Sequence, residues 1–171
     1  TTTYGMYFTG CNGGAGKGAR IANNTIMALT GNTGTLYGMY QTASTYNSTV
    51  NNVISVLTTG TTSYGAYMTG GGGNAFQNNT VVNSSTSTAT NNVAAYLTQT
   101  SGAQPALNIQ NNILSHLGGG RAMYTTNLNF IYSDYNTFYT TGATLIQWNT
   151  GNAYPTLQAW RDTSYWDLSS I

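Results

Sequence analysis

Apolar and polar residues alternate along short segments of this chain. In the segment Gly5-Met6-Tyr7-Phe8-Thr9, Met6 and Phe8 share one face, and Gly5, Tyr7 and Thr9 share the other. Alternation with a period of two is typical of a half-buried β-strand. We expect the Met/Phe face to point inward and the face of Gly or Ala, Tyr and Thr to point outward. The segment recurs around five Tyr-any-Thr triplets, with Tyr at 7, 40, 67, 96 and 124 and Thr at 9, 42, 69, 98 and 126.

A second short segment follows each triplet and contains an asparagine two residues before an apolar anchor. Asparagine tolerates a left-handed backbone, and its amide both donates and accepts hydrogen bonds. Stacked copies can therefore form a hydrogen-bonded ladder along neighbouring strands. The expected ladder residues are Asn24, Asn52, Asn79, Asn112 and Asn136, with anchors Ile26, Ile54, Val81, Leu114 and Phe138.

The spacing of the triplets predicts a repeat architecture. Successive tyrosines are 33, 27, 29 and 28 residues apart. A unit of this length, with two or three short strands and no helical period, buries its apolar side only by stacking on further copies. We therefore predict a parallel β-helix of about five coils. A propeller blade needs about four strands in some forty residues, and a strict period of six, as in hexapeptide helices, is absent.

The last part of the chain departs from the repeat. Pro155 suits the first turn of a helix, and Leu157, Trp160 and Arg161 follow at helical spacing. We expect residues 1–147 to form the coils and residues 148–171 a short helical cap or linking segment within one domain of a longer protein. Trp148, Trp160 and Trp166 occur only here. They are interpreted as a cap over the last coil or, alternatively, as a docking surface for a further module or copy.

The alternation "YGMYFTG" followed by "NNTI" resembles secreted bacterial right-handed parallel β-helix proteins of the pectate-lyase-like superfold. The tail segments "SDYNTFY" and "YPTLQAW" are similar to the closing segments of that group. The resemblance covers nearly the whole chain. It implies a right-handed β-helix and an extracellular or cell-surface location, but no particular activity, because this scaffold supports many functions.

Composition excludes several classes of function. Only 4% of the residues are charged, and the formal net charge is +1. Nucleic acids and anionic membranes require clustered Lys and Arg, so neither is an expected partner. No apolar run approaches the roughly 20 residues of a membrane helix. The single cysteine, Cys11, has no intrachain partner; we interpret it as a small buried hydrophobic residue or, alternatively, as an intermolecular link or a residue without a particular role.

Residues for acid–base or metal chemistry are few. The chain has no Glu, and Asp134 is the only acid within the coils; we expect it to hydrogen-bond the turn before Asn136. Asp162 and Asp167 are expected to pair locally or face water, and His116 to be structural or solvated, because it lacks partners at metal-ligand spacing. The run from Cys11 to Gly18 is glycine-rich but lacks the Lys-Ser/Thr of a phosphate-binding loop, which indicates an elongated connection. We expect no metal and no cofactor.

The outward Tyr and Thr columns are the surface feature with the clearest functional potential. Stacked aromatic side chains on adjacent strands stabilise a sheet, which accounts for the column without a ligand. The same stripe also suits contact with sugar rings or with a neighbouring copy. Ice binding is disfavoured because the Thr column runs beside bulky Tyr. Four N-glycosylation sequons occur, at Asn23, Asn47, Asn78 and Asn83; Asn47 and Asn83 are expected to lie on loops and to be the available acceptors.

Three functions remain open at this point. The preferred hypothesis is a non-enzymatic extracellular structural or adhesive module of a surface protein or filament. The alternative is a carbohydrate-binding β-helix that uses the Tyr/Thr columns, with glycans as partners. A polysaccharide lyase or hydrolase is the third and least favoured, because Asp134 would be the only acid in the coils.

Overall fold

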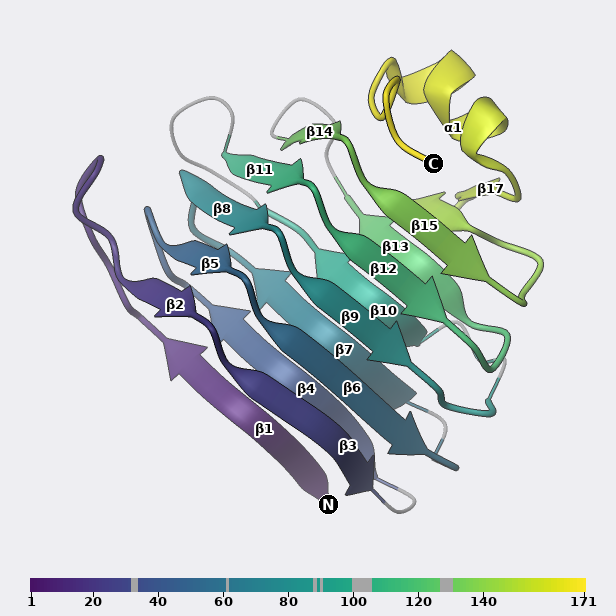
Figure 1. Ribbon diagram of the computed structural model, residues 1–171, viewed down its shortest axis with the longest axis horizontal. Coiled ribbons are helices and arrows are strands. Elements are labelled where there is room, and N and C mark those ends of the chain that lie inside the picture. Colours follow the sequence, from purple (N-terminus) through teal and green to yellow (C-terminus); the bar gives the residue numbers. More distant parts are fainter. Residues whose placement is uncertain (32–33, 61, 88, 90, 100–105, 127–130) are drawn as a thin grey trace.

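The computed structural model describes residues 1–171 apart from 32–33, 61, 88, 90, 100–105 and 127–130. The described chain winds as a right-handed parallel β-helix, with successive coils stacked side by side along the long axis (Figure 1). Each coil contributes one strand to each of three sheets. The predicted fold class is thus confirmed, and so are its five coils, to which β16 adds the start of a sixth.

The first sheet carries the tyrosine triplets and pairs strands from successive coils in parallel. Tyr7 lies beside Tyr40, Tyr40 beside Tyr67, Tyr67 beside Tyr96, and Tyr96 beside Tyr124. The final strand pairs antiparallel with the strand before it. In spatial order the strands are β1 (Thr2–Thr9), β4 (Thr35–Thr42), β7 (Thr62–Thr69), β10 (Asn92–Leu97), β13 (Arg121–Thr125), β16 (Ile146–Trp148) and β17 (Asn152–Tyr154).

The other two sheets form the rest of the coil wall. The second sheet comprises β2 (Arg20–Ala22), β5 (Ser48–Val50), β8 (Asn74–Gln77), β11 (Leu107–Gln110) and β14 (Ile131–Asp134). The third comprises β3 (Thr25–Gly31), β6 (Val53–Thr58), β9 (Thr80–Asn83), β12 (Ile113–His116) and β15 (Thr137–Thr140).

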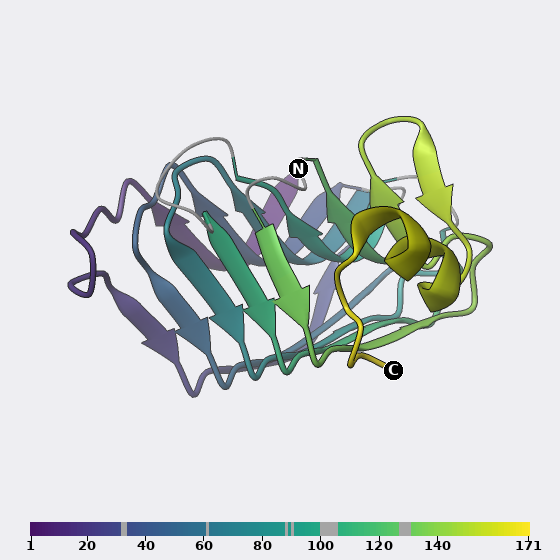
Figure 2. The ribbon, with the colours of Figure 1, turned by 90° about the horizontal axis from the view of Figure 1, so that it is seen from above.

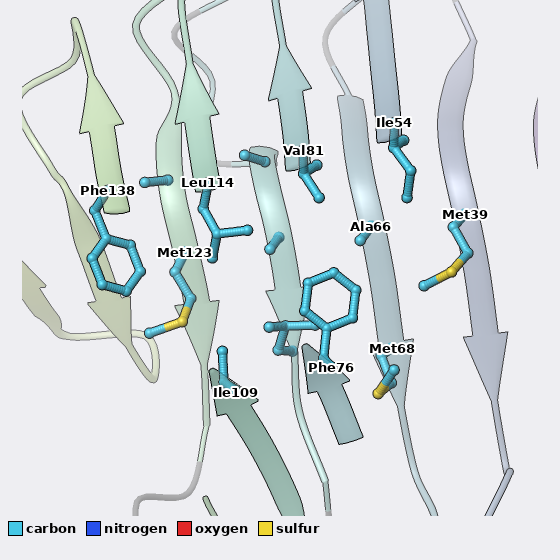
Figure 3. Close-up of a cluster of buried hydrophobic side chains, with 14 of the residues drawn as sticks. Met39, Ile54, Ala66, Met68, Phe76, Val81, Ile109, Leu114, Met123 and Phe138 are labelled. Atoms are coloured by element: carbon cyan, nitrogen blue, oxygen red, sulfur yellow. The ribbon is translucent and has the colours of Figure 1, made fainter. Parts of the chain in front are cut away.

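Side chains from all three sheets fill the interior (Figure 3). Met39 and Met68 come from the first sheet, Phe76 from the second and Ile54 from the third, and none is more than 1% exposed. Because each coil alone has only one layer of such side chains, the core exists only where coils are stacked.

The strict alternation expected for the first sheet is wrong at one position per coil. Gly5, Gly38 and Gly65 were expected on the outward face. An ideal Cβ on Gly38 would lie 2.5 Å from Ile54 Cγ2, and one on Gly65 would lie 2.3 Å from Val81 Cγ1. Gly38 and Gly65 therefore point into the interior, next to an inward residue. Each strand bends there, which places Tyr37 on the same outward side as Tyr40.

The asparagine ladder forms as predicted, along the turn between the second and third sheets. Asn52 Nδ2 donates to Asn79 Oδ1 at 2.9 Å, and Asn52 N donates to the same oxygen at 3.0 Å. Equivalent bonds join Asn24 to Asn52, Asn79 to Asn112 and Asn112 to Asn136. The left-handed residue is not the ladder asparagine but the one before it, for example Asn51 with φ 56° and Asn78 with φ 54°.

The tail covers the last coil. Helix α1 (Leu157–Ser164) begins after Thr156, whose side chain accepts from Ala159 N at 3.2 Å. Pro155 thus precedes the N-cap rather than occupying the first turn. Figure 2 shows α1 over one end of the stack. The boundary expected between residues 147 and 148 falls inside β16. Among the described residues, no helix is long and apolar enough to cross a membrane.

The three tryptophans take different places around this tail. Trp160 is fully buried and contacts Tyr154 edge to face, with ring centroids 5.4 Å apart. Trp148 Nε1 donates to Thr126 O at 2.8 Å, and Trp166 meets Tyr132 edge to face at 5.4 Å. Trp160 therefore packs inside the cap, as one of the two interpretations expected, while Trp148 and Trp166 are half-buried.

Candidate binding surface on the first sheet

The outer side of the first sheet carries the predicted column of stacked tyrosine rings. Tyr40 and Tyr67 stack with centroids 5.1 Å apart and planes 2° from parallel. Tyr7 stacks on Tyr40 at 5.2 Å, Tyr67 on Tyr96 at 4.6 Å, and Tyr96 on Tyr124 at 4.6 Å. In-register parallel pairing produces this column, because it places identical side chains directly beside one another.

A second tyrosine column, which our sequence analysis missed, runs beside the first. Tyr4, Tyr37 and Tyr64 stack at 5.2 and 5.1 Å, and each meets the first column edge to face, as in the 5.0 Å contact of Tyr37 with Tyr40. Strict alternation assigns Tyr4 to the inward face with Met6. The recurring sequence Tyr-Gly-Met/Ala-Tyr could have predicted this second column. Its glycine lets the strand bend, so that the tyrosines on both sides of the Gly-Met/Ala pair point outward.

Stacking decides which parts of the rings are available to a partner. Within each column the ring faces lie against one another, so ring edges and hydroxyl groups form most of the outer surface. Faces without a stacked neighbour occur at the ends, where Tyr4 and Tyr7 are 41% and 53% exposed. Along most of the column a partner would therefore meet phenol edges rather than open ring faces.

Partial burial affects the hydroxyl groups of this surface. Burial, reinforced by neighbouring tyrosines, raises the pKa of Tyr37 and of Tyr96 to about 12 and raises that of Tyr64 further. Burial also raises the pKa of Tyr67. These phenols stay protonated at neutral pH and can both donate and accept hydrogen bonds.

The predicted threonine column is only partly a surface feature. Thr9, Thr42 and Thr69 lie in register, and Thr9 is exposed. Thr98 is only 4% exposed and donates to Thr69 Oγ1 at 3.1 Å, so its expected outward exposure is wrong. Thr126 is half-buried.

A hollow of about 210 Å³ lies where the tyrosine columns end. Its lining includes Tyr64, Tyr96, Tyr124, Arg121 and Gln147. In the register of the second column, Val93 follows Tyr64 and Arg121 follows Val93, so the column of rings stops here. Burial lowers the pKa of Arg121. The hollow combines aromatic edges, amides and one guanidinium group.

The carboxylates take part in structural hydrogen bonds. Asp134 Oδ1 accepts from Tyr135 N at 2.9 Å and Ser169 N at 2.8 Å, which confirms its expected role at the turn. Asp162 accepts from Gln158 at 2.7 Å on the exposed side of α1. Asp167 bonds locally to Ser170 at 2.7 Å but does not face water: it is fully buried and also accepts from Asn136, 31 residues away, at 3.0 Å.

His116 is structural and fully buried. Its Nδ1 accepts from Gly118 N at 3.2 Å and from Gly120 N at 3.0 Å, which fixes the turn after β12. Burial lowers the pKa of His116 to about 4, so the ring is neutral at pH 7. Within the described ranges, no three His, Cys, Asp or Glu residues come together as a metal site.

The glycine-rich run forms the expected connection between β1 and β2. Lys17 N donates to Gly14 O at 2.8 Å within it, and Asn12 bridges to Thr45 of the next coil. Cys11 is half-buried with a free thiol, and its backbone N donates to Ser44 Oγ at 3.3 Å.

The expected availability of two glycosylation sequons is wrong, although Asn47 does lie on a connection, between β4 and β5. Asn47 and Asn83 are 1% and 0% exposed, and Asn83 lies in β9. Asn47 Oδ1 accepts from Ala19 N, and Asn83 Nδ2 donates to Val93 O. A glycan on either amide is incompatible with this packing. The side chains of the other two sequon residues, Asn23 and Asn78, are exposed.

Comparison of the chain with protein-family models, with curated proteins and with solved structures finds no match.

Proposed function

We propose that the chain is a non-enzymatic, extracellular structural and adhesive module that makes contact through the tyrosine surface of its first sheet. The observation that carries the proposal is the pair of interlocked tyrosine columns, which runs along β1, β4 and β7. Aromatic edges with protonated hydroxyl groups offer hydrophobic contact and hydrogen bonding together, the combination that enriches Tyr at interfaces.

The state of the ionisable side chains supports a binding role over catalysis. Asp134 and Asp167 are held by backbone and side-chain donors, and His116 is neutral and buried. A general acid or base needs to reach a substrate proton within hydrogen-bond distance. Asp167 and His116 are buried, and two backbone N–H groups donate to Asp134 Oδ1. Turnover of a polysaccharide that is abolished by Asp134→Asn would contradict the proposal.

Export belongs to the same proposal. Its support is the resemblance of the repeat to secreted bacterial β-helix proteins, together with the low share of charged residues in the chain, 4%. Detection of the protein on intact cells with an antibody against the folded chain tests it, and detection only after lysis contradicts it.

Adhesion is tested with substitutions that leave the ring stacks intact. Tyr40→Phe, Tyr67→Phe and Tyr96→Phe together remove three hydroxyl groups from the first sheet and keep the rings. Tyr135→Phe with Tyr139→Phe is the matched control, because both residues are more than half exposed but lie elsewhere. The triple variant is expected to lose most adhesion to cells or immobilised polysaccharides, while the control retains it. Equal adhesion by both variants would show that the tyrosine surface is not the contact site.

A second candidate function, carbohydrate binding, is favoured by the hollow beside Tyr124. Its amides, phenols and guanidinium group suit an oligosaccharide end or a single sugar ring. Calorimetric titration with a panel of neutral and acidic oligosaccharides tests it. Tyr124→Ala and Arg121→Gln are each expected to lower the affinity at least tenfold. If no sugar in the panel gives a heat of binding, carbohydrate binding by this hollow is excluded.

A further inference from the structure

The third sheet carries exposed apolar side chains on its outer face. Its strands β3, β6, β9, β12 and β15 lie side by side, and no other described element crosses them in Figure 1. Between 40% and 52% of each large side chain is exposed at Val53, Leu57, Ile113, Leu117 and Tyr139. None of the outward residues from the second to the fifth coil of this sheet is charged. A partner that matches this face is therefore itself uncharged and partly apolar.

Parallel in-register pairing sorts these outward residues into three columns that run across the coils. The first column consists of Val53, Thr80, Ile113 and Thr137. The second column consists of Ser55, Val82, Ser115 and Tyr139. Backbone hydrogen bonds such as that from Leu117 N to Asn83 O, at 2.8 Å, extend the same register by one residue. The third column therefore consists of Leu57, Ser84, Leu117 and Thr141.

Large and small residues alternate along every column and along every strand of this face. In the second and fourth coils the outer columns carry large aliphatic residues and the middle column carries a serine. In the third and fifth coils the outer columns carry serine or threonine and the middle column carries Val82 or Tyr139. The small positions are recessed: Ser115, which lies between Val82 and Tyr139, is only 8% exposed. The face is thus a checkerboard of apolar projections and small hydroxyl-bearing hollows.

A checkerboard fits a second copy of itself in one orientation. A two-fold axis that runs parallel to the strands, midway between β9 and β12, places the second coil opposite the fifth and the third opposite the fourth. Every projection then lies opposite a hollow. A two-fold axis along the stack of coils would instead place each coil opposite its equivalent, so that Val53 would meet Leu57, a projection against a projection. The pattern therefore selects two stacks that run antiparallel.

We propose that two copies of the chain associate face to face through the third sheet, with antiparallel stacks and the two-fold axis between β9 and β12. In this register Val53 lies opposite Thr137 of the second copy, and Tyr139 lies opposite its Ser55. The two sheets lie about 10 Å apart, as packed sheets do. The contact uses the same patch on both copies and closes on itself. It does not depend on the adhesive function proposed above, which uses the first sheet.

The size of the face allows a weak dimer. With about half of each large side chain exposed, the face offers roughly 600 Å² per copy, so two copies bury about 1,200 Å², the lower limit of a standard specific interface. We expect a Kd of about 10–100 µM. Because neither face is charged, ammonium sulfate should tighten the dimer by favouring apolar burial. A dimer that dissociates on addition of this salt contradicts the proposal.

Sedimentation equilibrium of the full chain at concentrations up to about 1 mM tests the association. A monomer–dimer equilibrium is expected. Val53→Lys places an unpaired charge inside the contact and should raise the Kd about tenfold or more. The matched control is Val50→Lys, because Val50 is a half-buried valine of the same coil that points outward from the second sheet. This control should leave the Kd unchanged.

A charge pair tests the register. Val53→Lys with Thr137→Glu places opposite charges against each other at two points of the dimer, so the Kd should return towards that of the parent. Within one copy the two positions lie three strand spacings apart, about 14 Å, so these charges do not pair in the monomer. A Kd that stays as high as that of Val53→Lys alone contradicts the proposed register.

Cross-linking gives an independent measure of the same register. In a Cys11→Ser background, Val53→Cys with Thr137→Cys is expected to give a covalent dimer with a short bismaleimide. Val53→Cys alone should give none, because the Val53 positions of the two copies would lie more than about 14 Å apart. A monomer at all concentrations, equal dimerisation of Val53→Lys and the parent, or cross-linking through Val53→Cys alone each overturns the proposal.

Discussion

The carboxylate of Asp167 ends the asparagine ladder: its Oδ1 accepts from Asn136 Nδ2 at 3.0 Å. The same carboxylate accepts from Trp160 Nε1 at 2.9 Å through Oδ2. Arg161 donates to the backbone carbonyls of Asp167 and Ser170. No further asparagine accepts from Asn136, and the tail supplies the acceptors instead: Asp167 Oδ1 for its Nδ2 and Ser170 Oγ for its backbone N.

Replacing Asp167 should lower the stability of the protein, because its carboxylate joins the cap to the last coil. Asp167→Ala removes the acceptor of the buried Trp160 Nε1 and one of three acceptors around Asn136 Nδ2, which keeps Ile109 O and Ser133 Oγ. We expect a loss of about 2–4 kcal/mol in the free energy of unfolding. Urea denaturation followed by tryptophan fluorescence measures it. Asp162→Ala is the control, because Asp162 is exposed, and it should change stability by less than about 0.5 kcal/mol. Similar losses in both variants would refute the capping role.

The two asparagines of a repeat should respond differently to substitution. Asn79→Ala removes bonds to Asn52, Asn112 and Thr49 O within the core, so we expect a loss of about 2–4 kcal/mol. Asn78 is exposed with φ 54°. Asn78→Ala should cost about 1–2 kcal/mol through backbone strain, and Asn78→Gly much less. Equal effects of Ala and Gly at residue 78 would contradict the conformational explanation.

His116 should make stability depend on pH. Its pKa is about 4 in the folded protein against 6.5 for an exposed histidine, so the unfolded chain binds more protons between these values. Stability is fully present above pH 6.5 and is lost as pH falls towards 4, by up to about 3 kcal/mol. His116→Asn keeps an acceptor for Gly118 N and Gly120 N and removes the titration.

Denaturation at several pH values in this window compares the two proteins. Only the parent should lose stability in this window. Its unfolding free energy minus that of His116→Asn should therefore fall steadily as the pH is lowered from 6.5 to 4. A difference that stays constant from pH 7 to pH 4 would show that His116 is not the responsible group.

A side chain at the inward glycine of the first sheet should be poorly tolerated. An added Cβ at Gly38 would lie 2.5 Å from both Ile54 Cγ2 and Gly65 O. We expect Gly38→Ala to destabilise the protein by about 1–3 kcal/mol, measured by thermal denaturation. Gly14→Ala is the control, since nothing lies within 4 Å of its Cβ position. Ala94 and Ala122 occupy the equivalent site in later coils and are fully buried. The interior of those coils therefore accommodates a methyl group at this site, whereas at Gly38 the space is filled by Ile54 and Gly65.

Much of the candidate surface could be predicted from the sequence. The recurring Tyr7, Tyr40 and Tyr67 identify one outward column, because parallel in-register strands place equal positions side by side. The column of Tyr4, Tyr37 and Tyr64 could not be found by alternation, since the bend at the glycines shifts the pattern by one residue. The hollow beside Tyr124 also escaped the sequence analysis, because residues as far apart as Tyr64 and Gln147 line it.

The sequence by itself determined the repeat, the parallel stacking of its strands and the asparagine ladder, because each depends on a pattern that recurs with every coil; it left open whether a coil has two or three strands. Tertiary structure alone decided how the repeat ends. The burial of Asp167, which accepts from Trp160 Nε1, depends on the tail that packs against the last coil. A periodic pattern specifies the contacts between equivalent residues, whereas the tail that covers the last coil is not part of the repeat, and no period encodes its contacts.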